Sequence, residues 1–346
     1  MRYGYWMPVF GGWLRNVPDE GMEASWNYVS RLARRSEEIG YSLSLIAELQ
    51  LNDIKGRDAP SLEAWSTAAA LAAVTRELEL MVAVRPTFHA PGLLAKQAAN
   101  IDAISGGRLS LNVVSSWWEE EARSLGFDFD KHDDRYARTG EWLDVVDRLW
   151  TTDRADYEGK MYRLQGATVA PKPVRQPRPL IYAGGESEAA KALIAQKCDA
   201  YVMHGDTPEV IGAKIADMEA RRRAIGMGPM QYGMAAYAIV RDSETEAERE
   251  LRRITAVDPD AVKLPPGFAN FDQWLSGTQL ERQLKLEEYS VSNRGLRPRL
   301  VGTPEQLKVK VAEYEAVGLN LLLLQMSPQY EEMERFAAQV IGAAVH

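Results

Sequence analysis

The sequence predicts one α/β domain over residues 1–346, a (β/α)8 TIM barrel with insertions after strands four and seven. Short apolar runs alternate with helical patterns along the chain, and near-continuous apolar strands are typical of a parallel sheet buried on both faces. Eight such strands favour a closed barrel over an open doubly wound sheet. The first strand also runs into Phe10-Gly11-Gly12-Trp13, not into the G-x-G-x-x-G turn of dinucleotide-binding sheets.

Eight runs have the length and apolar content of buried strands, and each is followed by a segment with helical periodicity. The expected strands are residues 3–9, 42–46, 78–84, 109–114, 179–183, 200–203, 231–240 and 320–324. The expected helices are residues 25–39, 61–74, 91–104, 117–125, 135–150, 187–196, 208–225, 245–256, a helix that starts at 303–305, and 330–344.

Residues that commonly begin and end helices flank several of these segments. Gly40 follows the first helix as a C′ glycine, and Ser61 is the expected N-cap of the second. Pro91 opens the third helix at a position where a backbone N–H has no partner within the helix. Thr303 and Pro304 together predict a capped start for the helix before the last strand.

Two segments exceed what a minimal barrel needs. Residues 152–178 contain a stretch at 157–162 that predicts a small hairpin, followed by a proline-rich return to strand five. Residues 257–299 are rich in proline and glycine, and irregular segments of this length are usually functional or disordered. Because this second segment follows strand seven, it emerges at the catalytic end of the barrel. We expect it to form a lid over that end.

The overall charge excludes several classes of partner. Forty-one basic residues against forty-nine acidic ones give a net charge of −8, whereas nucleic acids and anionic membrane surfaces both attract basic proteins. No apolar run approaches the roughly 20 residues of a membrane-spanning helix, and the N-terminus lacks the layout of a signal peptide. The single cysteine, Cys198, excludes an intramolecular disulfide and is typical of a reducing compartment. We therefore expect a cytoplasmic enzyme without nucleic-acid or membrane partners.

In such a barrel the catalytic residues lie at the carboxyl ends of the strands and in the loops that follow. Aromatic, hydroxyl and amide side chains are common at these positions in this chain. They include Trp6, Glu48, Arg85, His89, Asn112, Trp117, His204, Tyr237 and Gln325. The four histidines of the chain are too far apart in the sequence for a paired-ligand motif, so we expect no metal site.

The turn Gly184-Gly185-Glu186-Ser187 follows strand five and opens a helix. Its backbone N–H groups and the Ser187 hydroxyl suit a bound anion, although an ordinary tight turn has the same sequence. The run HDDRY at 132–136 is either a solvated helix start or a second side of the same anion site. The sequence does not decide between an anion site and an ordinary turn at 184–187, or between a solvated helix start and a part of that site at 132–136.

Two further features of the mouth also allow two interpretations. His204 at the end of strand six is either an acid–base group or part of a polar wall. Arg294, Arg297 and Arg299 cluster in the expected lid, where arginines are commonly solvated but can also close over an anionic ligand. From the residues alone, we expect a TIM-barrel enzyme that binds a phosphate-bearing ligand beside an aromatic pocket, and the reaction stays open.

Four sequence blocks occur in a fixed order along the chain. They are ISGGRLSLNVVSSW at 104–117, HDDRY at 132–136, AGGES at 183–187 and LVGTPE at 300–305. In this order they resemble the luciferase-like flavin monooxygenases, which are TIM barrels that use reduced FMN supplied by a separate NAD(P)H-dependent flavin reductase. The resemblance extends over essentially the whole chain. It implies a two-component, FMNH2-dependent enzyme that forms a dimer or tetramer.

Within that family the chain is most similar to the branch of the dimethylsulfone, alkanesulfonate and ring-opening pyrimidine monooxygenases. The segments YWMP at 5–8 and DPDAV at 258–262 resemble the dimethylsulfone enzymes most. The alkanesulfonate enzymes carry an arginine and a histidine where this chain has Ala235 and Tyr237, and a tryptophan in place of His204. The resemblance therefore implies a small organosulfur substrate, most like dimethylsulfone, that loses a C–S bond after oxygen transfer.

Three alternatives remain open beside this hypothesis. The first is an alkanesulfonate as substrate, and the second is ring opening of a nitrogen heterocycle of the pyrimidine or flavin type. A large planar pocket near His204 would favour ring opening. The third alternative is a flavin-binding protein without catalysis.

The resemblance also implies roles for individual residues. FMN contacts are expected at Ile46, Ala47, Asn112, Glu121, Arg135, Tyr136, Gly185 and Ser187, of which the last four surround the phosphate. The residues expected to orient the substrate and donate hydrogen bonds during oxygen transfer are His204, Tyr237, Asn293 and Arg294. Trp6, Trp117 and Arg297 are expected to line the substrate pocket.

Overall fold

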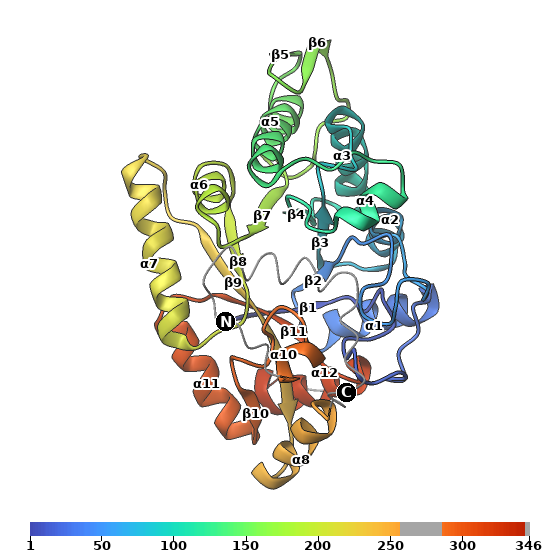
Figure 1. The fold of residues 1–346 in the computed structure, drawn as a ribbon, viewed down its shortest axis with the longest axis vertical. Helices are drawn as coiled ribbons and strands as arrows, with labels where there is room; N and C mark the ends of the chain where they lie inside the picture. The colour runs from blue at the N-terminus through green and yellow to red at the C-terminus, as the bar shows by residue number, and fades with distance from the viewer. Residues whose placement is uncertain (257–285, 343–346) are drawn as a thin grey trace.

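The computed structural model describes residues 1–256 and 286–342. In this part of the chain eight parallel strands form a closed barrel (Figure 1). Each strand pairs with the next one around the ring, including β8 with β9, and the last strand, β11, pairs with both β9 and the first strand, β1. Around the ring the strands are β1 (Arg2–Trp6), β2 (Leu43–Ile46), β3 (Glu79–Val84), β4 (Leu109–Val113), β7 (Leu180–Gly184), β8 (Ala200–Met203), β9 (Gln231–Val240) and β11 (Leu321–Gln325). The predicted TIM barrel is confirmed.

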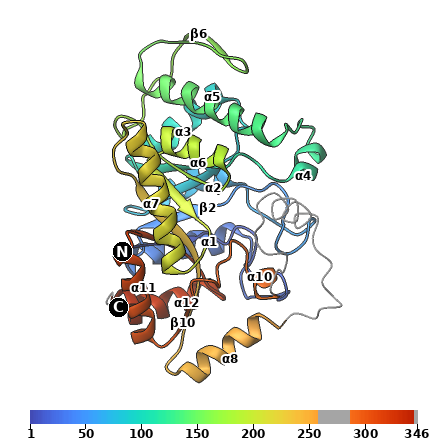
Figure 2. The ribbon, with the colours of Figure 1, turned by 60° about the vertical axis from the view of Figure 1, so that its left-hand side comes forward.

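Helices cover the outside of the barrel (Figures 1 and 2). The helices of the described residues, including the short α4 and α10 in loops after β4 and α8, are α1 (Trp26–Glu38), α2 (Ala64–Val74), α3 (Pro91–Ser105), α4 (Glu119–Ser124), α5 (His132–Thr151), α6 (Glu188–Lys197), α7 (Pro208–Ala224), α8 (Glu244–Ile254), α10 (Leu286–Ser290), α11 (Pro304–Ala316), α12 (Gln329–Phe336) and the π-helical turn η1 (Ala337–Ile341). The capped start of α11 is confirmed, since Thr303 and Gln306 form a reciprocal capping box. The prediction for Ser61 is wrong. The N-cap of α2 is Glu63, whose carboxylate accepts hydrogen bonds from two backbone N–H groups of the first turn.

Two insertions depart from the minimal barrel. After strand four, β5 (Ala155–Glu158) and β6 (Arg163–Ala167) form the predicted antiparallel hairpin, at the top of Figure 1 beyond α5. Of the expected lid, residues 257–285, which include the DPDAV segment, lie outside the described residues. The rest contains α10 and a turn, and then a short strand, β10 (Leu300–Gly302), pairs with the end of β9. The predicted elements do not include β10, because a run of three residues has too little periodicity to be recognised.

Alternation along the strands divides the apolar side chains into two sets. The larger set packs between the strands and the helices. At the amino end of the barrel, Glu79 accepts hydrogen bonds from Arg2 and Tyr182, which fills the interior at that end. The inner set that fills the barrel is Leu43, Leu45, Met81, Tyr182, Ala200, Leu321 and Leu323.

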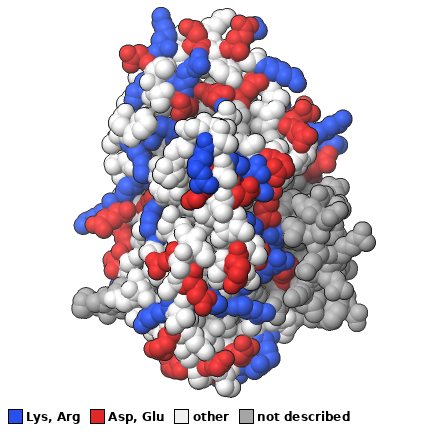
Figure 3. All heavy atoms as spheres, turned by 90° about the vertical axis from the view of Figure 1, so that its left-hand side faces the viewer, with Lys and Arg blue, Asp and Glu red and all other residues white. Residues whose placement is uncertain are grey.

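The surface of the described residues carries charges of both signs. On the face shown in Figure 3, acidic and basic side chains are interspersed. Among the helices that the structure describes, none combines the length and the apolar character needed to cross a membrane. The polar groups that concern function lie instead at the carboxyl end of the barrel, which is called the mouth below.

Candidate active site

Two amide side chains face the barrel interior from opposite walls of the mouth. Asn112 on β4 pairs in register with Tyr182, and Gln325 lies two positions beyond Leu323 on β11. Because Tyr182 and Leu323 belong to the interior set, alternation directs both amides inward. Three strands separate β4 from β11 in either direction around the ring. The two amides therefore lie across the mouth from each other.

Several buried polar atoms of this inner wall have no hydrogen-bond partner within the described part of the chain. They are Trp6 Nε1, Ser110 Oγ, Asn112 Oδ1 and Gln325 Oε1. A buried polar group left without a partner costs about 1–3 kcal/mol, and most such groups in native proteins are paired. The inner wall thus fits a ligand that carries both hydrogen-bond donors and acceptors.

The turn between β7 and α6 leads into the N-terminus of a helix and is closely packed at Gly185. Gly185 has a φ of +146°, and a Cβ at this position would lie 2.6 Å from Cβ of Ala190 and 3.4 Å from the Tyr136 hydroxyl. Ser187 is the N-cap of α6, and its hydroxyl accepts a hydrogen bond from the Ala190 N–H at 3.2 Å. The positive end of the helix dipole and a serine at the N-cap are features of helix N-termini that bind phosphate.

Two residues of the HDDRY run lie beside this turn. Burial raises the pKa of Tyr136, while Ser187 and Arg135 oppose that shift. The Tyr136 hydroxyl therefore stays protonated and can donate a hydrogen bond. Arg135 donates to the backbone carbonyls of Ser115 at 3.2 Å and Asp130 at 2.7 Å, and burial lowers its pKa. The structure thus brings Tyr136, Gly185 and Ser187 together, with Arg135 in the adjoining wall.

The predicted FMN contacts on strand two lie on different faces. Ile46 is fully buried within the outer apolar set, whereas Ala47 follows the strand, is half-buried and lies at the edge of that set. Of the two side chains, only that of Ala47 keeps an exposed surface that a ligand could contact. A contact with Ile46 would have to use its backbone.

Glu121 on α4 lies in a buried ion cluster and is fully buried itself. Its Oε1 accepts hydrogen bonds from the backbone N–H of Gln50 at 2.5 Å and of Leu51 at 3.3 Å. Both of its carboxylate oxygens also bind the guanidinium of Arg85. The structure gives the Glu121 carboxylate this structural role, so a direct contact of that carboxylate with FMN is not supported.

Glu48 completes the cluster around Arg85. It accepts a hydrogen bond from the backbone N–H of Arg85 at 2.8 Å, and His89 Nε2 lies 2.5 Å from its other oxygen. Arg85 is only 1% exposed. Glu48, Arg85 and His89 follow predicted strands two and three, but the sequence alone predicted no role for them. The feature that could have revealed the cluster is an acidic residue after one strand and basic residues after the neighbouring parallel strand.

Glu186 is the centre of a second polar cluster at the mouth. Lys214 Nζ lies 2.7 Å, Arg294 Nη1 3.2 Å and His204 Nδ1 3.9 Å from its carboxylate. Burial by itself raises the pKa of Glu186, but His204, Lys214 and Arg294 together lower it to about 2. The ionised carboxylate thus holds two predicted catalytic residues, His204 and Arg294, in one place. Neither Glu186 nor Lys214 is among the site residues that were predicted from the sequence.

The predicted pocket residue Arg297 extends this cluster. Its Nε lies 2.6 Å from Glu288, and its Nη1 lies 3.6 Å from Asp206. Asp206 in turn lies 3.8 Å from Lys214. Arg294 and Arg297 therefore both form ion pairs with carboxylates at the mouth.

The turn that carries Asn293 and Arg294 is docked on the strand ends. Both residues adopt left-handed backbone conformations, with φ of 57° and 53°. The Gly205 N–H donates to the Asn293 carbonyl at 3.0 Å, and the Tyr237 N–H donates to the Gly295 carbonyl at 2.7 Å. Tyr237 is buried beside this turn, and burial raises its pKa well above the ordinary value. Three predicted catalytic residues thus meet where this turn covers β9.

The two tryptophans expected in the substrate pocket have different surroundings. Trp6 packs edge-on against Trp13, with ring centroids 6.4 Å apart, and belongs to the inner wall. Trp117 stacks on the buried Trp118 at 5.6 Å with an interplanar angle of 7°. Trp117 is 36% exposed, so it offers an aromatic surface to solvent.

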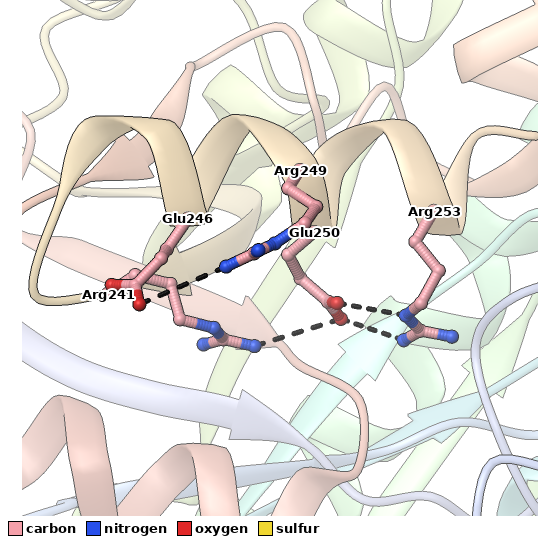
Figure 4. A pocket seen from close by; sticks show the side chains of 5 residues that line it. All are labelled: Arg241, Glu246, Arg249, Glu250 and Arg253. Atoms are coloured by element: carbon pink, nitrogen blue, oxygen red, sulfur yellow. Dashed lines mark hydrogen bonds and ion pairs between the residues drawn. The ribbon is translucent and has the colours of Figure 1, made fainter.

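A surface hollow on α8 is lined by Arg241, Glu246, Arg249, Glu250 and Arg253 (Figure 4). Glu250 lies 2.7 Å from Arg253 and 3.7 Å from Arg241, and Glu246 lies 3.9 Å from Arg249. Since carboxylates already compensate these arginines, the hollow is a weaker anion site than the α6 N-terminus.

His204 gives the site a testable pH dependence. Burial lowers its pKa to about 4; Arg294 and Lys214 act in the same direction, and Glu186 opposes them. Between pH 6.5 and 4 the unfolded chain binds a proton that the folded chain does not, so the free energy of unfolding falls as the pH is lowered. We expect His204→Asn to flatten this part of the stability profile in urea unfolding. His132→Asn, at an exposed position, is the control. An unchanged slope in His204→Asn would contradict this account.

Comparison with known proteins agrees with this geometry. Residues 1–321 match the family model described as luciferase-like monooxygenase. The chain belongs to this family. This chain is 32% identical to the FMNH2-dependent dimethylsulfone monooxygenase of Pseudomonas putida, and the match covers 99% of this chain and 94% of the relative. The enzyme of the same name from Pseudomonas fluorescens strain Pf0-1 is 30% identical over 99% and 93%.

A solved structure has the same fold as this luciferase-like monooxygenase. It is the crystal structure of riboflavin lyase (RcaE) with modified FMN and substrate riboflavin. Its TM-score is 0.83 at 20% identity, and the match covers 99% of this chain and 90% of that chain. At 20% identity this match supports the fold of the chain, which is a closed barrel. The family resemblance predicted from the four sequence blocks is confirmed.

Proposed function

We propose that this luciferase-like monooxygenase is the oxygenase of a two-component system that uses FMNH2 and O2 to cleave a C–S bond of dimethylsulfone. The observation that carries the proposal is a serine-capped helix N-terminus beside a barrel mouth in which buried amide oxygens have no hydrogen-bond partner among the described residues. Two relatives at 32% and 30% identity, matched over nearly their full length, are FMNH2-dependent dimethylsulfone monooxygenases. The enzyme accordingly uses FMN as its cofactor.

The described residues fit FMN. Gly185, Ser187 and Tyr136 would hold the phosphate at the N-terminus of α6, where the helix dipole and the exposed N–H groups favour a dianion. Asn112 lies on β4, which pairs with β7, and its unpartnered oxygen would meet a donor of the flavin ring or ribityl chain. Arg85, held by Glu48 and Glu121, would keep the adjacent loops in place.

The reaction requires few acid–base groups from the protein. When bound, reduced FMN supplies the two electrons that activate O2. Insertion of one oxygen atom into a methyl C–H bond of dimethylsulfone gives a hydroxymethyl sulfone, and the second oxygen atom leaves as water. The C–S bond then breaks with its electron pair staying on sulfur, which yields methanesulfinate and formaldehyde. The protein has to orient the substrate, donate hydrogen bonds and exclude water.

His204 can hydrogen-bond the hydroxymethyl group from which the C–S bond is lost. Its ring is neutral at physiological pH because burial lowers its pKa to about 4. The same shift makes it a weaker base than an ordinary histidine, so its proposed role is to orient the hydroxyl by a hydrogen bond. The Glu186 carboxylate, 3.9 Å away, opposes the lowering of this pKa. Tyr237, Asn293 and Arg294 would shape the same side of the mouth.

The proposed partners follow from the cofactor. An enzyme that consumes FMNH2 needs a flavin reductase to supply it, and we propose a separate NAD(P)H-dependent reductase. A homodimer or homotetramer and a cytoplasmic location remain predictions from the sequence.

A panel of three substrates tests the proposed function. The protein is incubated with FMN, NADH, a flavin reductase and O2, and with dimethylsulfone, methanesulfonate or uracil. We expect methanesulfinate and formaldehyde in equal amounts from dimethylsulfone, and no conversion of the other two compounds. Consumption of uracil would support ring opening instead. Formation of hydrogen peroxide without consumption of dimethylsulfone would contradict the proposal.

A further inference from the structure

The wall formed by β11 and β1 carries polar atoms that the proposed FMN site does not use. Gln325 is 1% exposed, and its Oε1 has no partner in the described part of the chain. Trp6 Nε1 is buried and unpartnered in the same way. Tyr5 pairs with Leu324 in register, so Trp6 and Gln325 are neighbours on adjacent strands and on the same inner face. These two side chains, together with Tyr237 as the register partner of Gln325 on β9, form a polar spot at the end of this wall.

This spot lies across the mouth from the FMN-binding residues. Asn112 is on β4, and Gly185 and Ser187 are in the turn after β7. Three strands separate β4 from β11, and three separate β7 from β1, in both directions around the ring. A flavin anchored by its phosphate on the β7 side approaches the barrel axis from that side. The wall with Trp6 and Gln325 is then the one left to face the substrate.

The neighbouring inner-facing positions carry no charge. Gly233 pairs with Leu321 and Ala235 pairs with Leu323, which lie directly below Gln325 on the same face. The described cations Arg85, Lys214, Arg294 and Arg297 at the mouth all lie within ion-pair distance of carboxylates. An anionic group at this wall would lose its hydration without a counter-charge beside it, which is strongly unfavourable.

We infer that Trp6 and Gln325 bind the oxygen atoms of an uncharged substrate and make the enzyme select sulfones over sulfonates. The inference rests on the proposed function for the sulfone itself. The indole N–H is a donor only, so its partner in a ligand is an acceptor. The Gln325 amide can turn its NH2 end to the same ligand by rotation of its terminal torsion. Both oxygens of a sulfone accept hydrogen bonds, so one molecule can accept from the indole N–H and from the amide NH2.

A binding measurement that needs no turnover tests this inference. The protein is loaded with oxidised FMN, and dimethylsulfone binding is followed by saturation transfer to its methyl NMR signal. We expect Gln325→Met and Trp6→Phe each to raise the Kd for dimethylsulfone by about tenfold. Flavin fluorescence should show unchanged FMN affinity in both variants, which also verifies that they are folded. Gln97→Met, the same change at an exposed position of α3, should leave both affinities unchanged.

The outcomes separate this inference from the proposed function. Unchanged dimethylsulfone binding in both folded variants would overturn the inference, even if the wild type converts the sulfone. A wild type that binds methanesulfonate as tightly as dimethylsulfone, or binds neither, would overturn it as well. Binding that depends on Trp6 and Gln325 without any conversion would support the inference and contradict the proposed function.

Discussion

Replacing Arg85 with methionine is expected to lower the free energy of unfolding by about 3–5 kcal/mol. Arg85 is 1% exposed, and its guanidinium binds both oxygens of the buried Glu121. Its Nε also lies 3.7 Å from the buried Glu48. The methionine variant leaves two buried carboxylates without their shared cation. Urea unfolding followed by circular dichroism measures the change.

An exposed ion pair provides the matched control. Arg57 binds Glu120, and both side chains are more than two-fifths exposed. We expect Arg57→Met to change the free energy of unfolding by only about 0–1 kcal/mol. If the loss in Arg85→Met is as small as in the control, the cluster does not organise the loops after β2 and β3.

Replacing Gly185 with alanine is expected to reduce FMN affinity by roughly 10- to 100-fold. The backbone φ of +146° is one that residues with a side chain rarely adopt, and the new Cβ would lie 2.6 Å from Cβ of Ala190. The turn must then move away from α6, which disrupts the contacts proposed for the phosphate. Fluorescence titration of the apoprotein with FMN measures the effect.

Gly92 is the control for this substitution. It lies in the first turn of α3, and a Cβ there meets no described atom within 4 Å. Gly92→Ala should therefore bind FMN like the wild type. An FMN affinity of Gly185→Ala equal to that of Gly92→Ala would show that the turn after β7 does not hold the cofactor.

The sequence predicted the parts of the site whose geometry is local. Eight apolar runs with helices between them were enough for the barrel, because parallel strands buried on both faces have few other arrangements. Gly185 and Ser187 lie in one turn before a helix, so their proximity was readable from a short motif. The HDDRY run was one of the open possibilities for the same site, the resemblance assigned Tyr136 to the phosphate, and the structure places its hydroxyl at that turn.

Other parts of the site depend on contacts between distant segments. Lys214 on α7 reaches Glu186 after β7, and nothing in the sequence near Lys214 distinguishes it from a solvated lysine. Glu121 was expected at the flavin because a family contact was transferred by position, whereas the partner that occupies it, Arg85, lies 36 residues earlier. The pairing of Gln325 with Trp6 needs the barrel to close between its first and last strands.

The most direct test of the account compares reduced FMN with reduced riboflavin as ligands under anaerobic conditions. We expect the wild type to bind reduced FMN about 10- to 100-fold more tightly, since charge-assisted hydrogen bonds to a phosphate contribute about 1.5–3 kcal/mol. Ser187→Ala should weaken the binding of FMN more than that of riboflavin. Equal affinities of the wild type for the two flavins, or an equal loss for both in Ser187→Ala, would contradict a phosphate site at the N-terminus of α6.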